Sequence, residues 1–114
     1  TLLGYQEKKI LIDYMQRAKA FVYAAVEDFG IIPIEALACG TPVIALNNGA
    51  TAETIAHKIN GIHFKNQNAE DIIYTINEFE SLKFNLKEIS EKAQTYSIHR
   101  FKKEIEDFVV SKIT

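Results

Sequence analysis

Hydrophobic residues follow two alternating patterns along the chain. Short continuous apolar runs, typical of strands buried on both faces, occur at Thr1–Leu3, Ala20–Ala25, Pro42–Leu46 and Gly61–Phe64. Longer amphipathic segments separate these runs, as expected for helices that cover a parallel sheet. The alternation predicts an α/β fold, a Rossmann-like parallel sheet with flanking helices.

The first two helices are predicted from apolar spacing and from helix-end signals. One is expected over Glu7–Lys19, with an inward face made of Ile10, Leu11, Tyr14 and Ala18. The next is expected to begin near Gly30, with Pro33 in its first turn and Gly40 at its C-terminal end. This second helix would directly follow a buried strand.

Two further helices are expected in the middle of the chain. Thr51 is predicted to cap a short helix that runs to Ala56, after a turn at Asn47–Gly49 whose residues tolerate positive φ. Ala69–Phe79 is predicted to form the next helix.

No strand pattern returns in residues 82–114, which we expect to form a helical tail. Leu86–Tyr96 and Ile98–Val110 have helical spacing, and the second segment carries an apolar stripe of Ile98, Phe101, Ile105, Phe108 and Val109. No linker divides the chain, so a single domain is expected. Because Thr1–Gly4 is strand-like without a preceding turn, we expect this domain to be truncated.

Composition narrows the classes of function. The chain has 114 residues, 47% hydrophobic and 25% charged, and a net charge of -2 with scattered Lys and Arg, which argues against nucleic acid as a partner. Ala20–Val26, the longest apolar run, is far shorter than the about 20 residues of a spanning helix. Cys39, the single cysteine, is interpreted as a packing residue. A cytoplasmic location is expected.

Two acidic residues frame the most informative loop. In an open parallel sheet ligands bind beyond the carboxyl ends of strands, here the loops after Ala25 and Leu46. The helix N-terminus at Gly30 offers free N–H groups to an anion such as a diphosphate. Glu35, about one turn into the helix, is placed to accept both hydroxyls of a ribose, and Glu27 to hold sugar hydroxyls.

A plainer interpretation of the same residues stays open at this point. Glu35 would be an acid that stabilises the first turn of its helix, and Glu27 a solvated loop residue. Against this, Glu35 is flanked by Ile34, Ala36 and Leu37, and an acid in apolar surroundings is costly unless it has a partner.

The run Glu27–Ala45 resembles the E-x7-E signature of family 4 GT-B glycosyltransferases, including its F-G step and its A-C-G-T-P-V-I-A stretch. Leu2–Gly4, Gly49–Ile55 and Asn60–Phe64 are similar to flanking segments of the family, with Asn60 where Thr is usual. The resemblance spans nearly the whole chain, and it implies the donor-binding, C-terminal domain of a GT-B fold.

The resemblance implies a retaining glycosyltransferase that moves a sugar from a GDP- or UDP-sugar to an acceptor glycan or lipid-linked sugar. Glu27 would hold the donor sugar as the catalytic residue, and Glu35 the ribose. The remaining donor-binding residues carried over are Phe29, Gly30, Ile31, Asn48, Gly49, Ala50, Thr51 and Glu53. Neither a cofactor nor a metal is expected, and His57, His63 and His99 are expected at the surface or in packing.

The partners follow from the same resemblance. The family's phosphate-binding Arg and Lys and its N-terminal acceptor domain are not among these residues, so this chain alone is expected to be inactive. The final helix would cross back to the acceptor domain of the same protein. The sequence of Asp28–Ile34 resembles that of mannosyltransferases in bacterial surface-polysaccharide pathways, and the location expected for this protein is the cytoplasm, at the inner face of the membrane.

Two alternatives are carried along. One is a sugar-nucleotide epimerase built on the GT-B architecture, which the E-x7-E spacing disfavours. The other is a non-catalytic α/β interaction domain of the receiver or flavodoxin type. A receiver needs an Asp at a strand end, whereas Asp13 falls in a helix and Asp28 in the loop framed by glutamates.

Overall fold

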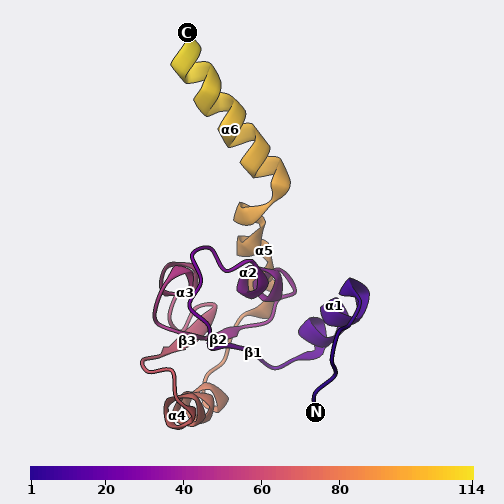
Figure 1. Ribbon diagram of the computed structural model, residues 1–114, viewed down its shortest axis with the longest axis vertical. Coiled ribbons are helices and arrows are strands. Elements are labelled where there is room, and N and C mark those ends of the chain that lie inside the picture. Colours follow the sequence, from indigo (N-terminus) through magenta and orange to yellow (C-terminus); the bar gives the residue numbers. More distant parts are fainter.

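Three short parallel strands form the centre of the protein, in a computed structural model that describes residues 1–114. The strands β1 (Phe21–Tyr23), β2 (Val43–Leu46) and β3 (Gly61–Phe64) are ordered β1-β2-β3, so that β2 lies in the middle (Figure 1). Val22 is opposite Ile44 in the register. The predicted α/β fold with a parallel sheet is confirmed.

Helices cover both faces of this sheet. They are α1 (Lys8–Arg17), α2 (Ile31–Ala38), α3 (Ala50–Thr54), α4 (Ala69–Glu80), α5 (Leu86–Lys92) and α6 (Ile98–Ile113), with a 3-10 helix η1 (Ala93–Tyr96) between the last two. In Figure 1, α2 lies above the sheet and α4 below it. The predicted helical tail is confirmed, with η1 in place of the end of its first helix.

The core is divided into two layers by the alternation of side chains along β2. Val43 and Ala45 pack with residues of α2 and α5, whereas Ile44 and Leu46 pack with residues of β3 and α4. All four residues of β2 are buried. A strand covered on both faces needs apolar residues at every position, which explains the continuous run in the sequence.

The bounds of α2 are set by two glycines in left-handed conformations. Gly30, at the N-cap, has φ 75° and Gly40, just past the C-cap, has φ 80°. Pro33 is buried in the first turn, where its missing N–H is not needed. The predicted start and end of this helix are confirmed.

The predicted inward face of α1 is wrong. Ile10, Leu11 and Tyr14 are 40–46% exposed, and α1 contains no buried residue. Met15 is the α1 residue that packs against the core, and the Thr41 hydroxyl donates a hydrogen bond to its carbonyl. The difference arises because α1 packs beside α2 rather than across the sheet, so its apolar side borders a surface groove.

Two other local predictions are wrong. Thr1–Leu3 is not a strand, since no neighbouring strand pairs with it and Leu2 is fully exposed. Thr51 does not cap α3, because Gly49 holds the N-cap position. The Thr51 hydroxyl is instead buried and donates to the carbonyl of Leu46 over 2.7 Å, which satisfies the end of β2.

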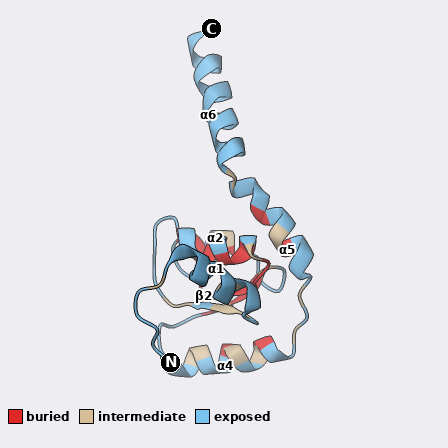
Figure 2. Ribbon diagram, turned by 90° about the vertical axis from the view of Figure 1, so that its right-hand side faces the viewer, coloured by how far each residue is buried: buried red, intermediate tan, exposed pale blue.

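The helix α6 extends away from the rest of the domain and is exposed along its whole length (Figure 2). Its predicted apolar stripe is present and exposed, with side chains of Ile98, Phe101, Ile105, Phe108 and Val109 between 49% and 74% accessible. Ion pairs one turn apart, such as Arg100 with Glu104 at 2.8 Å, line its polar side.

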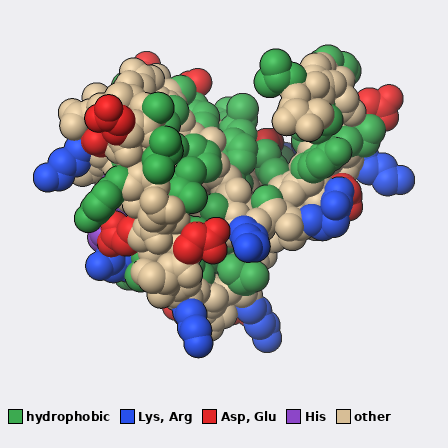
Figure 3. Space-filling model, turned by 90° about the horizontal axis from the view of Figure 1, so that it is seen from below, with side chains coloured by type: hydrophobic (Ala, Val, Ile, Leu, Met, Phe, Trp, Pro, Cys, Tyr) green, Lys and Arg blue, Asp and Glu red, His purple; other side chains and the backbone are tan.

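The surface carries mixed charge. Seen from below, basic and acidic side chains are interspersed among apolar ones, without a continuous basic area on that face (Figure 3). None of the helices combines the length and the apolar character that crossing a membrane requires.

Candidate functional site

Two helix N-termini lie side by side at the carboxyl edge of the sheet. The helix α2 follows β1, α3 follows β2, and these two strands are paired neighbours. The N–H of Ala50 donates to the carbonyl of Glu27 over 2.9 Å, which joins the two loops directly. The two loops singled out in the sequence therefore meet in one place.

Gly49 makes this close approach possible. A Cβ atom at this position would lie 2.7 Å from the Glu27 carbonyl oxygen and 3.2 Å from Cγ1 of Val26. The backbone of Gly49 also has φ 66° and ψ -148°, a conformation that is essentially confined to glycine. The loop after β2 can approach Glu27 only because this residue has no side chain.

Several backbone donors at this edge have no acceptor within the protein. The N–H groups of Phe29, Gly30 and Ile31 take part in no hydrogen bond, as is typical of a helix N-terminus. With the positive end of the helix dipole, such donors suit an anion. Phe29 and Ile31 have side chains that are 60% and 63% exposed, while Gly30 is buried.

The loop after β2 offers fewer free N–H groups than the four residues predicted to bind the ligand there would supply. Asn48 and Ala50 use their N–H groups within the protein, on the carbonyls of Leu46 and Glu27 respectively. Gly49 and Thr51 retain free N–H groups, although the Thr51 side chain is turned inward. For Asn48 and Ala50, a ligand contact would have to come from other atoms.

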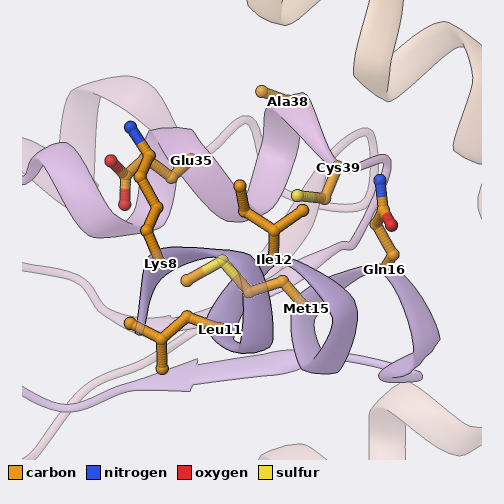
Figure 4. Close-up of a pocket in the computed structure, with 8 residues that line it drawn as sticks. All are labelled: Lys8, Leu11, Ile12, Met15, Gln16, Glu35, Ala38 and Cys39. Atoms are coloured by element: carbon orange, nitrogen blue, oxygen red, sulfur yellow. The ribbon is translucent and has the colours of Figure 1, made fainter. Parts of the chain in front are cut away.

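Glu35 lines a pocket of about 250 Å³ between α1 and α2 (Figure 4). Lys8 and Gln16 of α1 supply its polar side chains together with Glu35, and Leu11, Ile12 and Met15 its apolar wall. In Figure 4 the ammonium group of Lys8 and the carboxylate of Glu35 extend toward the same end of the groove. A carboxylate and an ammonium group above an apolar wall suit the hydroxyl groups and ring of a nucleoside.

The sequence left two environments open for Glu35, a position among apolar residues and a position in the first turn of its helix, and the structure shows neither. Its side chain is exposed, so the cost of placing an acid among Ile34, Ala36 and Leu37 does not arise. The first turn of α2 contains no acid, so the alternative role as a first-turn residue is wrong too. The helix turns Glu35 away from the buried face that its apolar neighbours form.

Lys8 and Gln16 were not identified from the sequence. They share one side of α1 with Ile12 and Met15, because Lys8, Ile12 and Gln16 are four residues apart and Met15 is three residues after Ile12. That spacing was a usable signal, but a face centred on Ile10 and Tyr14 was expected to point inward. Of the residues predicted for the apolar side of α1, Leu11 lines this pocket, whereas Ile10 and Tyr14 do not.

A larger apolar groove of about 460 Å³ adjoins the other side of Glu35. Phe29, Ile31 and Ile34 form one wall, and Tyr96 and Ile98 the other. The groove therefore runs from the N-terminus of α2 to the first residue of α6, so that the exposed stripe of α6 begins at its rim.

Glu27 is exposed, and its main chain anchors the two loops through the bond from Ala50. Tyr23, at the end of β1, lies close to the Glu27 side chain. Burial, and then the neighbouring Glu27 carboxylate, raise the pKa of Tyr23. Both causes favour the neutral phenol, so that Tyr23 stays a potential hydrogen-bond donor beside Glu27 in neutral solution.

Cys39 also borders the α1–α2 pocket. Burial, followed by the negative charge of Glu35, raises the pKa of its thiol. The neutral thiol is the poorer nucleophile, which agrees with a packing role.

His57 and His63 make hydrogen bonds within the protein, whereas His99 lies exposed on α6. His63 donates from Nε2 to the carbonyl of Thr51 over 2.9 Å, and Nδ1 of His57 accepts from the N–H of His63. Glu53 is exposed in the first turn of α3, where an acid stabilises a helix N-terminus. No group of three or more His, Cys, Asp or Glu side chains is arranged to hold a metal ion.

Comparison with known proteins gives a consistent set of similarities. Residues 1–97 match the family described as glycosyl transferases group 1. An uncharacterized glycosyltransferase of Methanocaldococcus jannaschii is 34% identical over 77 residues, which cover 67% of this chain and 20% of that protein.

Two functionally named relatives match shorter segments. The alpha-1,3/1,6-mannosyltransferase of Saccharomyces cerevisiae is 44% identical over 62 residues, 54% of this chain and 12% of that protein. Sucrose synthase 6 of Arabidopsis thaliana is 38% identical over 56 residues, 49% of this chain and 6% of that protein. The aligned part of the chain covers a fifth or less of the length of each of these relatives.

Proposed function

The chain belongs to the glycosyl transferases group 1 family, and from that premise we propose that it forms the nucleotide-sugar donor site of a retaining glycosyltransferase. The observation that carries this proposal is the meeting of two helix N-termini beside two exposed carboxylates at the carboxyl edge of the sheet. Free N–H groups suit a diphosphate, and carboxylates suit sugar hydroxyls.

Each part of the donor has a proposed place. The diphosphate binds the free N–H groups at Phe29–Ile31, with those of Gly49 and Thr51 close by. The ribose binds Glu35, and the base lies in the adjoining α1–α2 pocket. The transferred sugar binds Glu27, whose position is fixed through its main chain by the loop at Gly49.

Lys8 adds a positive charge to this arrangement. Its side chain reaches the end of the groove at which Glu35 lies (Figure 4). A cation near a diphosphate offsets the charge that develops as the sugar departs. The aligned part of this chain covers a fifth or less of the length of the relatives that it matches, so transfer itself is proposed for the complete protein.

The class of sugar is proposed from the relatives. Proteins named as mannosyltransferases are among those that match the chain, including one of Mus musculus that is 54% identical over 35 residues. We therefore favour GDP-mannose over a UDP-sugar as the donor, and a glycan or lipid-linked sugar of a surface polysaccharide as the acceptor. Such a protein would act in the cytoplasm, at the inner face of the membrane.

The acceptor-binding part is proposed to belong to the same protein. The exposed stripe of α6 and the apolar groove at its base present a continuous surface with no partner in this chain. Because the chain covers only a fifth of the length of the M. jannaschii relative, the remaining part of the protein is the proposed occupant of that surface.

Titration of the isotope-labelled chain with GDP, GDP-mannose, UDP and UDP-glucose tests the donor site. Amide shifts are expected at Phe29–Ile31 and Gly49–Thr51, with the guanosine compounds bound more tightly. A hydrogen bond to a charged group contributes about 1.5–3 kcal/mol, so Glu35→Ala should weaken binding about 10- to 100-fold.

Glu80 is an exposed acid on α4, remote from both loops, and its replacement by alanine is the matched control. The Glu80→Ala variant should bind the nucleotides as tightly as the wild type does. Equal binding by wild type, Glu27→Ala and Glu35→Ala would contradict the assignment of the site. Parallel measurements on the complete protein, with transfer of mannose as the readout, extend the test to the reaction.

A further inference from the structure

A third cavity, a pocket of about 390 Å³, opens at the carboxyl end of β3, the edge strand opposite β1. It lies between the residues that follow β3, beginning at Lys65, and one side of α4. Unlike the α1–α2 pocket and the groove beside α6, it is lined mainly by polar side chains. None of the residues that we assign to the donor site belongs to it.

Thr75 is the most informative residue of this pocket. It is only 3% exposed, yet its hydroxyl takes part in none of the protein's hydrogen bonds. The oxygen is not sealed off from solvent, since no buried polar side-chain atom without a partner occurs in the protein. A nearly buried hydroxyl that opens only into a pocket is offered to whatever enters that pocket.

The charges around Thr75 are already held by protein partners. The carboxylate of Asp71 accepts hydrogen bonds from the main chain and side chain of Asn66, over 2.9 Å and 3.1 Å. Glu78 lies 3.7 Å from the ammonium group of Lys58. Because both carboxylates have partners, the pocket lacks the concentrated negative charge that would select a metal ion or another small cation.

Donors and acceptors are mixed in the remaining lining. Lys65 and the hydroxyls of Tyr74 and Thr75 can donate, whereas the free oxygen positions of Asp71 and Glu78 can accept. Tyr74 is 74% exposed and offers an aromatic face next to these polar groups. A neutral ring that carries several hydroxyls, and whose C–H side can lie on an aromatic ring, matches this combination.

We propose that the pocket between β3 and α4 binds one neutral pyranose unit, free of any nucleotide. Its volume of 390 Å³ is near the lower end of the about 300–1,000 Å³ that is usual for small-molecule pockets, which fits one sugar ring better than a nucleotide sugar. The occupant is thus a glycan unit, a different ligand from the donor proposed above.

Two hydrogen bonds join the segments around this pocket to the segments that carry the proposed donor loops. Gln67, in the loop before α4, donates from Nε2 to the carbonyl of Ala24 just after β1, over 2.6 Å. His63, which lines the pocket, donates to the carbonyl of Thr51 in α3. The pocket therefore holds its sugar on the edge of the sheet where the donor loops lie.

The test is a titration of the isotope-labelled full chain with methyl α-D-mannopyranoside and methyl α-D-glucopyranoside, each with and without saturating GDP. Amide shifts are expected at Lys65, Asn66 and Thr75 in both cases. Thr75→Val keeps the shape and removes the hydroxyl, and loss of one neutral hydrogen bond should weaken sugar binding about five-fold. Glu80→Gln, on α4 but outside the pocket, should leave sugar binding unchanged.

Three results would overturn the proposal. The first is the absence of shifts near Lys65 and Thr75 at sugar concentrations up to about 100 mM, at which a site with a Kd of about 1 mM would be saturated. The others are shifts confined to Phe29–Ile31, or equal shifts with sodium phosphate. If Thr75→Val proves unstable by thermal unfolding, Glu78→Gln tests the same pocket. Shifts caused by GDP alone at Phe29–Ile31 report separately on the donor site, so the two proposals can fail independently.

Discussion

Replacement of Gly49 by alanine should disrupt the junction between the two donor loops. The new Cβ atom would lie 2.7 Å from the carbonyl oxygen of Glu27, a main-chain atom that already accepts the hydrogen bond from Ala50. The backbone angles of Gly49, φ 66° and ψ -148°, are also unfavourable for a residue with a side chain. The substitution therefore combines conformational strain with a clash that flexible side-chain atoms cannot relieve.

The magnitude follows from these two contributions. Strained backbone costs about 1–3 kcal/mol and an overpacked contact a further about 1–3 kcal/mol, so Gly49→Ala should destabilise the fold by about 2–6 kcal/mol. For a domain of this size, 1 kcal/mol lowers Tm by roughly 4 °C, which gives a decrease of about 8–24 °C. The loop carrying Glu27 should move away from α3, and GDP binding should weaken with it.

Gly30→Ala is the matched control. Gly30 also has a positive φ, of 75°, but a Cβ atom there would make an ordinary contact, 3.7 Å from Cβ of Ala50. Only the left-handed conformation is penalised, at about 1–2 kcal/mol. Thermal and urea unfolding followed by circular dichroism measure both variants. A Gly49→Ala protein as stable as Gly30→Ala would refute the argument from the close approach of the two loops.

Three further outcomes are expected. Thr51→Val should lower the free energy of unfolding in urea by about 0.5–1.5 kcal/mol, because the hydrogen bond from the hydroxyl to the Leu46 carbonyl is lost while that carbonyl keeps its bond from the Asn48 N–H. Thr51→Ser should restore most of this loss, and equal stability of both variants would contradict the explanation. The raised pKa of Cys39 should make its alkylation by iodoacetamide slow near pH 7 and faster as the pH rises above 9. The reaction should be faster in Glu35→Gln, and an unchanged rate in that variant would exclude the Glu35 charge as a cause of the raised pKa. Ile105→Ser should change the Tm of this chain by less than about 2 °C, equivalent to about 0.5 kcal/mol, because Ile105 is exposed. The same substitution should lower the Tm of the complete protein, and an unchanged Tm there would rule out docking of α6 on the rest of that protein.

The central part of the fold could be predicted from the sequence because its local signals agree with its environment. The strand β2 is covered on both faces, and its four consecutive apolar residues indicate this burial. The glycines at 30 and 40 mark the ends of α2 because both positions require positive φ. A single sequence is sufficient to predict an element when its signal depends only on the backbone conformation of one residue, or on the burial of every position in a strand.

Predictions failed where the outcome depended on a neighbouring element. Thr1–Leu3 has the residues of a strand, but a strand forms only with a hydrogen-bonded partner. The apolar residues of α1 were assigned to a core-facing side, but α1 packs beside α2, and Met15 reaches the core instead. Thr51 suits an N-cap, but the end of β2 captured its hydroxyl.

The sequence by itself determined the residue types of the candidate site: the glutamates at 27 and 35, the glycine before α2, and the glycine before α3. The tertiary structure decided how they are combined. Pairing of β1 with β2 brought Gly49 against Glu27, and the packing of α1 on α2 brought Lys8 to Glu35, residues far apart along the chain. Spacing along a chain fixes which side chains share one helix or strand, whereas contacts between elements depend on how their buried surfaces fit together.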